Sequence, residues 1–161
     1  MDVFEIAKKM ELEGKQAYLE MLEKTTNPAL KNILRRLAEW EDNHYIIFDA
    51  MQQEADLIEV KKATTEEVKK IFSSLKNINA PDHISEQIAF YEEAINVEIK
   101  SANYYKEIAA EIADETVKKE VLMIADEELK HKKILQEILN YLQEPNQWVE
   151  SAEFNLDAED Y

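Results

Sequence analysis

The sequence contains no cysteine, a single glycine and three prolines in 161 residues. Without cysteine the chain has no disulfide, no thiolate zinc site and no thiol nucleophile, so any metal ligand must be a Glu, Asp or His side chain. This composition fits a reducing compartment. The scarcity of glycine and proline argues against a turn-rich sheet protein and is typical of helices joined by few turns.

Long hydrophobic runs are absent as well. No stretch approaches the roughly 20 apolar residues that span a membrane, and the first residues lack the basic flank and apolar run of a signal peptide. We therefore expect a soluble, cytoplasmic protein with no membrane partner.

Basic residues are few compared with acidic ones, 19 against 35, which gives a net charge of -16. A nucleic-acid-binding protein needs clustered Lys and Arg to replace counterions along the phosphate backbone, so we expect no nucleic-acid partner. The acidic surface would attract cations, although ordinary solubility is the simpler explanation.

Four segments show apolar residues at alternating spacings of three and four, the pattern of helices with one face against a core. They cover residues 4–21, 30–51, 88–112 and 117–142. Short links near residues 25–27 and 113–114 predict two antiparallel helical hairpins. Asn27, followed by Pro28, and Asp114 are the expected N-caps.

A long connection separates the two hairpins. Within it, Thr64 and Glu67 form a capping-box pattern before a short helix that ends near Leu75. A connection of this length can travel the height of a bundle, so we expect an all-α, ferritin-like four-helix bundle with one long crossover. Residues 1–142 would form this single domain, and residues 143–161 an acidic C-terminal arm.

An internal repeat crosses both hairpins, because residues 11–44 align with residues 98–131 without a gap. The identical pairs are Glu11/Glu98, Tyr18/Tyr105, Glu20/Glu107, Lys31/Lys118, Ala38/Ala125, Glu41/Glu128 and His44/His131. A shared helical period would preserve apolar residues, whereas this repeat preserves polar residues that interrupt the apolar faces. A duplicated half-site is the simpler explanation.

Helix geometry brings the repeated polar residues to one height. At about 1.5 Å per residue, Glu11 and Glu41 both stand about 21 Å from the turn of their hairpin. In the second copy, Glu98 and Glu128 stand at a matching distance from the turn of their own hairpin. A Glu and a His three residues apart share a helix face. We therefore expect six side chains to converge in one cavity: Glu11, Glu41, His44, Glu98, Glu128 and His131.

Four carboxylates in an apolar interior repel one another, and each costs on the order of several kcal/mol when unpaired. Two divalent ions would neutralise them. Oxygen-rich ligation with one imidazole per ion suits iron, with manganese or zinc as substitutes. A Glu on each of two helices and Glu-x-x-His on the other two is the known di-iron pattern of bundles. Buried polar pairs without metal, or a single ion, are the alternatives.

The sequence resembles the rubrerythrin family over about residues 1–142. The resemblance rests on Glu11, Tyr18 and Glu41-Asp42-Asn43-His44, repeated as Glu98, Tyr105 and Glu128-Leu129-Lys130-His131. It implies that the second Glu of each copy bridges two iron ions, that the first Glu is a terminal ligand, and that each His binds one iron. Tyr18 and Tyr105 would donate hydrogen bonds to carboxylates, with plain core packing as the alternative.

Two features depart from the family's pattern. Rubrerythrins carry a four-cysteine, rubredoxin-like domain that supplies electrons, so here electrons would come from a separate protein such as a rubredoxin. The family also has an extra Glu one turn after the first ligand of the third helix, where this chain has Ser101. The remaining six-residue set is more symmetric, resembles that of bacterioferritin, and puts redox-linked movement of an iron in doubt.

The resemblance favours a peroxidase that reduces hydrogen peroxide in defence against oxidative stress. We also expect a homodimer. A ferroxidase that uses oxygen and stores iron, and a non-enzymatic helical module, are the alternatives. Gly14 is expected to allow a close approach to its helix. Other polar residues are expected at the surface: His83, Glu92, Glu93, Asp126 and Glu127.

Overall fold

The computed structural model describes residues 2–53, 66 and 84–143, and these residues form four long α-helices. They are α1 (Val3–Lys24), α2 (Pro28–Gln52), α4 (Ile84–Glu111) and α5 (Glu115–Gln143). No strand occurs in the described part of the chain, which confirms the all-α prediction. Nor is any helix there long and apolar enough to cross a membrane. The expected short helix and the arm of residues 143–161 lie outside the described residues, apart from Glu66 and Gln143.

Capping side chains set the starts of three helices. The carboxylate of Asp2 accepts a hydrogen bond of 3.0 Å from the backbone N–H of Phe4, in the first turn of α1. Asn27 caps α2 by accepting from two backbone N–H groups, and Pro28 occupies the first helical position. Asp114 caps α5 in the same way. The caps predicted at Asn27 and Asp114 are confirmed.

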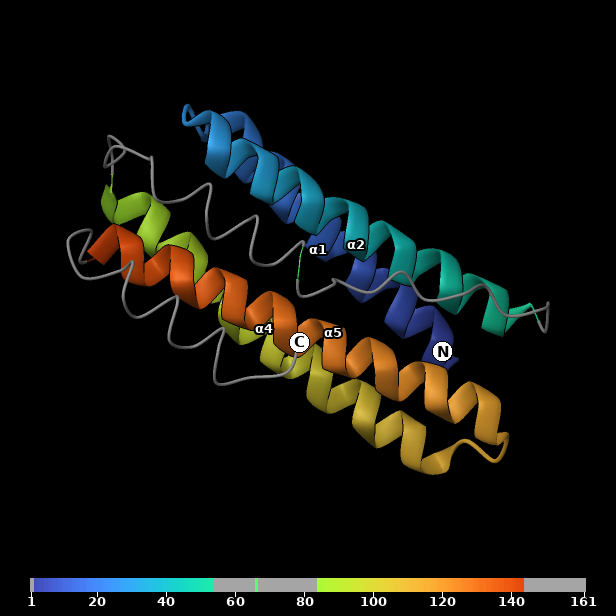
Figure 1. Ribbon diagram of the computed structural model, residues 1–161. Helices are drawn as coiled ribbons and strands as arrows, with labels where there is room; N and C mark the ends of the chain where they lie inside the picture. The colour runs from blue at the N-terminus through green and yellow to red at the C-terminus, as the bar shows by residue number, and fades with distance from the viewer. Residues whose placement is uncertain (1, 54–65, 67–83, 144–161) are drawn as a thin grey trace.

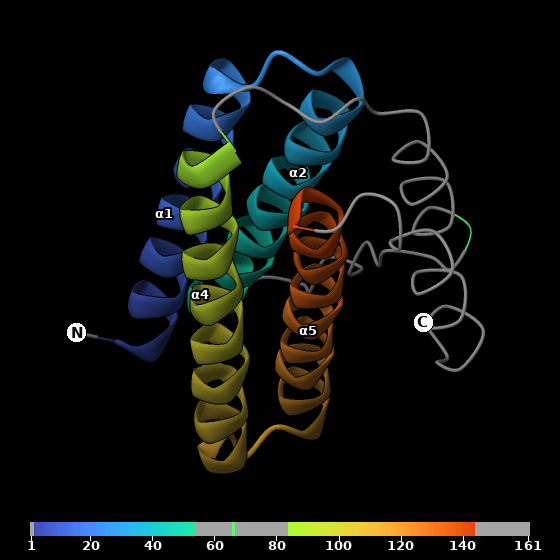
Figure 2. The same cartoon turned by 90° about the vertical axis from the view of Figure 1, so that its left-hand side faces the viewer.

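The helices pair as two antiparallel hairpins, α1 with α2 and α4 with α5 (Figure 1). The turn between α1 and α2 and the turn between α4 and α5 lie at opposite ends of the bundle (Figure 2). Helix α2 therefore ends at one end of the bundle and α4 begins at the other, as a one-crossover topology requires. Contacts of α1 with α4 and of α2 with α5 close the four helices around a common interior.

The apolar interior consists of two clusters separated by a polar layer. One cluster, near the turn between α1 and α2, includes Leu34 and Ile138. The other, near the turn between α4 and α5, includes Phe48 and Ile124. On every helix the Glu and His residues of the repeat lie in sequence between the members of these two clusters. Apolar packing on both sides thus holds the polar layer at one height.

The prediction that Glu127 lies at the surface was wrong. Its side chain is buried, with an exposed fraction of 1%, whereas the neighbouring Asp126 is exposed as expected. Ile134 and Tyr141, seven and fourteen residues further on and thus on the same side of the helix, are buried too. Helix α5 therefore buries a second face beside the one that carries Glu128, and a single apolar stripe could not reveal it.

Candidate metal centre

Six buried side chains meet in the polar layer. They are Glu11 from α1, Glu41 and His44 from α2, Glu98 from α4, and Glu128 and His131 from α5. Their exposed fractions do not exceed 3%. These are the side chains that the repeat predicted to converge, and the structure brings all of them together.

His44 faces two carboxylates. Its Nδ1 atom lies 2.7 Å from Glu128 Oε1 and 3.5 Å from Glu11 Oε2. Together with Glu41, these three residues each offer one ligand atom, and the four atoms all lie within 4.8 Å of one another. This first group could hold one metal ion.

His131 has the equivalent surroundings in the second copy. Its Nδ1 atom lies 3.1 Å from Glu41 Oε1 and 3.7 Å from Glu98 Oε1. These residues and Glu128 form a second group of ligand atoms within 4.8 Å of one another. Glu41 and Glu128 belong to both groups, so the two groups share their carboxylates as a two-metal centre would.

A stack of three rings passes through the site. The imidazoles of His44 and His131 lie 5.6 Å apart at an angle of 14°, and the indole of Trp40 stacks on His131 at 5.2 Å and 16°. The guanidinium of Arg36 lies 4.9 Å from the centre of the Trp40 ring. Trp40 was not predicted, although its position four residues before His44 places it on the same side of α2.

Each tyrosine of the repeat donates a hydrogen bond to the first glutamate of the other copy. The hydroxyl of Tyr18 on α1 donates a hydrogen bond to Glu98 on α4. The hydroxyl of Tyr105 on α4 donates to Glu11 on α1 at 2.7 Å. The two bonds cross between the hairpins and fix the orientation of both carboxylates.

Glu41 and Glu128 have pKa values that are shifted toward the protonated form. Burial raises the pKa of Glu41 well above its usual range, and repulsion by Glu11 and Glu98 raises it further. The pKa of Glu128 is raised in the same way, by burial first and then by the charges of Glu11 and Glu41. A cation bound at either position would favour the ionised carboxylate and oppose this shift.

Glu11 and Glu98 are shifted in the opposite direction. Burial alone would raise the pKa of Glu11, but the attraction of His44 and hydrogen bonds outweigh burial, and the pKa is lowered. For Glu98, a hydrogen bond with Glu128 and the charge of His131 outweigh burial and lower the pKa to about 2. Burial would lower the pKa of His44, but the Glu11 carboxylate raises it.

Several ligand atoms of the site have no hydrogen-bond partner of acceptable geometry among the described residues. Glu98 Oε2 is one of them, and Glu11 Oε2 and Glu128 Oε1 have only the ion-pair contacts with His44 Nδ1 described above. A buried polar atom without a partner costs about 1–3 kcal/mol. Carboxylate oxygens and imidazole nitrogens are suitable ligands for divalent iron or manganese, so the atoms present fit a metal centre.

Gly14 makes room for the carboxylate of Glu41. A Cβ atom at position 14 would lie 2.8 Å from Glu41 Oε2, closer than real Cβ contacts. A larger residue there would have to displace this carboxylate. The close approach that the sequence predicted at Gly14 is therefore to the centre itself.

A family model described as Rubrerythrin matches residues 2–94 and 89–158 of the chain. The chain belongs to the rubrerythrin family. Membership places it among di-iron oxidoreductases in general, and the buried Glu and His cluster could hold the metal ions. No curated protein and no solved structure matches the sequence.

Ser101 does not belong to either group of candidate ligands. Ser101, at the position of the family's extra Glu, is buried and lines the same cavity as Glu98. In the part of the chain that the structure describes, the two groups of possible ligands contain the six predicted side chains and no others. His83, predicted at the surface, lies outside the described residues.

Proposed function

We propose that this rubrerythrin-family protein is a non-haem di-iron oxidoreductase that reduces hydrogen peroxide to water with electrons from a separate donor protein such as a rubredoxin. One observation carries the proposal: two groups of buried ligands share Glu41 and Glu128 in the interior of a four-helix bundle. The proposal includes a cytoplasmic, homodimeric protein that protects against oxidative stress.

The six side chains would divide between two ions. Glu41 and Glu128 would bridge them, Glu11 and His44 would complete one set, and Glu98 and His131 the other. Four carboxylates balance the charge of two divalent cations. Oxygen-rich ligation with one imidazole per ion suits iron, and manganese or zinc could substitute.

When bound, the two irons would supply the two electrons that cleave the O–O bond and would recover them from the donor. Hydrogen peroxide takes up two electrons and two protons and yields two molecules of water. None of these 161 residues is a cysteine, so they provide no four-cysteine iron site to deliver electrons. A second protein is therefore part of the proposal.

Tyr18 and Tyr105 orient the terminal carboxylates. Burial, followed by the charge of Glu98, raises the pKa of Tyr18 well above its usual range, and burial and Glu11 do the same for Tyr105. Both hydroxyls stay protonated at neutral pH and keep donating their hydrogen bonds. Their role is to hold Glu98 and Glu11 in position for the metals.

A ferroxidase is the second candidate, and Ser101 favours it. Without the extra Glu the two halves of the ligand set are equivalent, which suits a site that iron passes through. Iron storage would need a hollow cage of many subunits, so light scattering separates the two functions. A small oligomer would exclude a mineral core.

Rapid mixing tests the proposed function directly. The protein is loaded anaerobically with ferrous iron and mixed with either hydrogen peroxide or oxygen, and the rate at which the iron oxidises is followed optically. Much faster oxidation by peroxide supports the peroxidase. Faster oxidation by oxygen rejects it in favour of the ferroxidase, with the same six ligands.

A further inference from the structure

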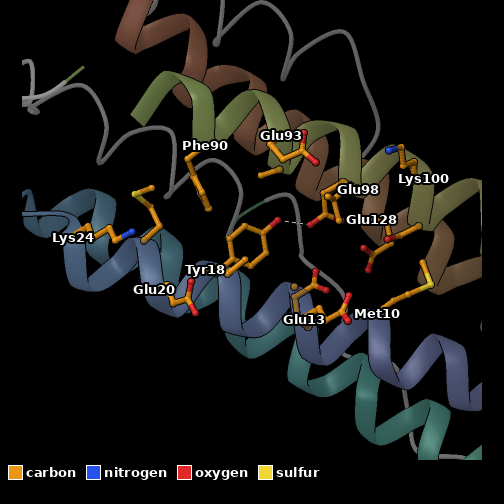
Figure 3. Close-up of a pocket in the computed structure, with 17 residues that line it drawn as sticks. Met10, Glu13, Tyr18, Glu20, Lys24, Phe90, Glu93, Glu98, Lys100 and Glu128 are labelled. Carbon is orange, nitrogen blue, oxygen red and sulfur yellow. Dashed lines mark hydrogen bonds between the residues drawn. The ribbon is translucent and has the colours of Figure 1, made fainter. Parts of the chain in front are cut away.

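A cavity of about 440 Å³ opens between α1 and α4 and reaches the metal centre. Its inner wall is formed by Tyr18, Glu41, Glu98 and Glu128. In Figure 3, Lys24 and Phe90 lie toward one end and Met10 and Lys100 toward the other, with Tyr18, Glu98 and Glu128 between them. The cavity thus connects three of the four candidate carboxylate ligands with the outside of the bundle.

From this cavity we infer that the substrates of the centre include neutral organic hydroperoxides, whose apolar body binds between α1 and α4 while the O–O group lies beside Glu41, Glu98 and Glu128. The inference rests on the proposed function and deepens it, because it names a second class of peroxide. Three properties of the cavity support this inference: its volume, the apolar side chains of its walls and the charges around it.

The size of the cavity exceeds what hydrogen peroxide needs. A volume of about 440 Å³ lies within the range of small-molecule binding sites, roughly 300–1,000 Å³. Hydrogen peroxide has two heavy atoms and no apolar surface. A ligand with an organic body would fill space that the smaller peroxide leaves to water.

The walls are mainly apolar. They include Met21, Phe90, Ala94 and Val97, and Val97 is 41% exposed. Apolar side chains give hydrogen peroxide no attractive contact, but they stabilise a hydrocarbon group by removing it from water. The wall chemistry therefore favours an alkyl or aryl hydroperoxide.

Small residues line the cavity on both helices. Ala17 and Ala94 line it from opposite helices, and Ser101 lies beside Glu98. Gly14 is the extreme case, because even a Cβ atom there would come within 2.8 Å of Glu41 Oε2. Larger side chains at these positions would take up space in the cavity.

The charges around the cavity select a neutral ligand. Two lysines, Lys24 and Lys100, line it together with three exposed acidic residues, Glu13, Glu20 and Glu93. The whole chain carries a net charge of -16, which repels anions. A fatty-acid carboxylate is therefore disfavoured relative to an uncharged hydroperoxide.

The reaction balances with the components already proposed. An organic hydroperoxide ROOH takes two electrons from the centre and two protons from solvent. Its O–O bond breaks, the oxygen that remains on carbon becomes the hydroxyl of ROH, and the other oxygen leaves as water. The donor protein then restores the two electrons.

Binding of a product alcohol tests the cavity without turnover. The full-length protein, loaded with redox-inert zinc, is titrated with 2-phenyl-2-propanol, the product of cumene hydroperoxide, and binding is followed by NMR. Ala17→Trp and Val97→Trp fill the cavity from opposite helices at exposed positions. Gln16→Trp adds the same bulk at an exposed position that does not line the cavity.

We expect saturable binding that each filling variant weakens by about tenfold or more and that Gln16→Trp leaves unchanged. Absence of saturable binding to the wild-type protein would overturn the inference. So would binding that neither Ala17→Trp nor Val97→Trp weakens, because the alcohol would then lie elsewhere. Circular dichroism confirms that each variant retains its helices.

Steady-state rates with the iron-loaded protein supply the second readout. Ala17→Trp should lower kcat/KM for cumene hydroperoxide about tenfold relative to kcat/KM for hydrogen peroxide, and Gln16→Trp should leave that ratio unchanged. An unchanged ratio in both filling variants would overturn the inference. If the wild-type protein reduces neither peroxide, the proposed function fails, whereas missing alcohol binding overturns the cavity assignment alone.

Discussion

The indole of Trp40 lies face to face with the imidazole of His131, with ring centres 5.2 Å apart and planes 16° apart. The Nδ1 atom of His131 in turn lies 3.1 Å from Oε1 of Glu41, one of the two carboxylates shared by both ligand groups. Since Trp40 is only 2% exposed, its emission depends on the buried site rather than on solvent. The protein therefore carries an internal optical probe of metal binding.

Metal binding should quench Trp40. Ions with unfilled d shells, such as Co²⁺, accept excitation energy from a nearby indole, and His131 would hold the ion directly beside this ring. In a Trp148→Phe variant, which leaves Trp40 as the only tryptophan, we expect strong quenching that ends when both ligand groups are filled. A Trp40→Phe variant is the control. Unchanged Trp40 emission with bound Co²⁺ would show that the metal is not at His131.

Gly14→Ala should affect folding and metal binding in opposite directions. Alanine favours the helix over glycine by about 1 kcal/mol, so the metal-free variant should be as stable as the wild-type protein or more stable. The added Cβ would press on Glu41 Oε2 at 2.8 Å and should weaken metal binding. Urea unfolding and a metal titration measure the two effects. Metal affinity equal to that of the wild-type protein would contradict the close contact.

Tyr18→Phe and Tyr105→Phe should each weaken metal binding. Each change removes the hydrogen bond that orients a carboxylate, and loss of such a partner typically costs about 10–100-fold in metal affinity. Tyr91→Phe is a matched control, because the buried Tyr91 hydroxyl has no hydrogen-bond partner among the described residues. Its metal affinity should not change, and its stability should not fall. Equal losses in all three variants would point to core packing as the role of the tyrosines.

The raised pKa values of Glu41 and Glu128 predict that the metal-free protein loses stability as the pH rises. Their pKa values in the folded chain lie well above the ordinary value of 4.5. The folded state therefore binds more protons than the unfolded state above pH 4.5. This stabilisation is complete below that pH and is lost as the pH rises through the folded-state pKa, with a slope of up to about 1.4 kcal/mol per pH unit for each carboxyl.

Urea unfolding of the chelator-treated protein between about pH 5 and pH 8 measures this slope. In a variant with both Glu41→Gln and Glu128→Gln the slope should become shallower, because neither amide titrates. Metal must displace the same protons, so its stabilising effect should grow with pH. A flat pH profile for the metal-free wild-type protein would contradict the assigned protonation.

Much of the fold and of the site could be predicted because both depend on local periodicity. The spacing of Glu11, Glu41, His44 and their repeat partners determines which helix face each occupies and how far each stands from its turn, and the caps at Asn27 and Asp114 are local as well. Two antiparallel hairpins leave little freedom beyond these two quantities.

The unpredicted features depend on how the helices rotate and pack against each other. The stacking of Trp40 on His131 joins α2 to α5, and the burial of Glu127 reflects a second packed face of α5. The cavity between α1 and α4 is defined by small residues such as Ala17 and Ala94, which a sequence pattern reads as ordinary helix formers. Such features require the relative positions of whole helices.

The stoichiometry of anaerobic ferrous binding tests the central claim, a two-metal centre held by six side chains. The account predicts two ions per chain in the wild-type protein, because two groups of ligands share Glu41 and Glu128. His44→Ala should lose one ion and keep the other, whereas a variant with both Glu41→Ala and Glu128→Ala should bind neither and remain helical. Two tightly bound ions in that double variant, or none in the wild-type protein, would contradict the account.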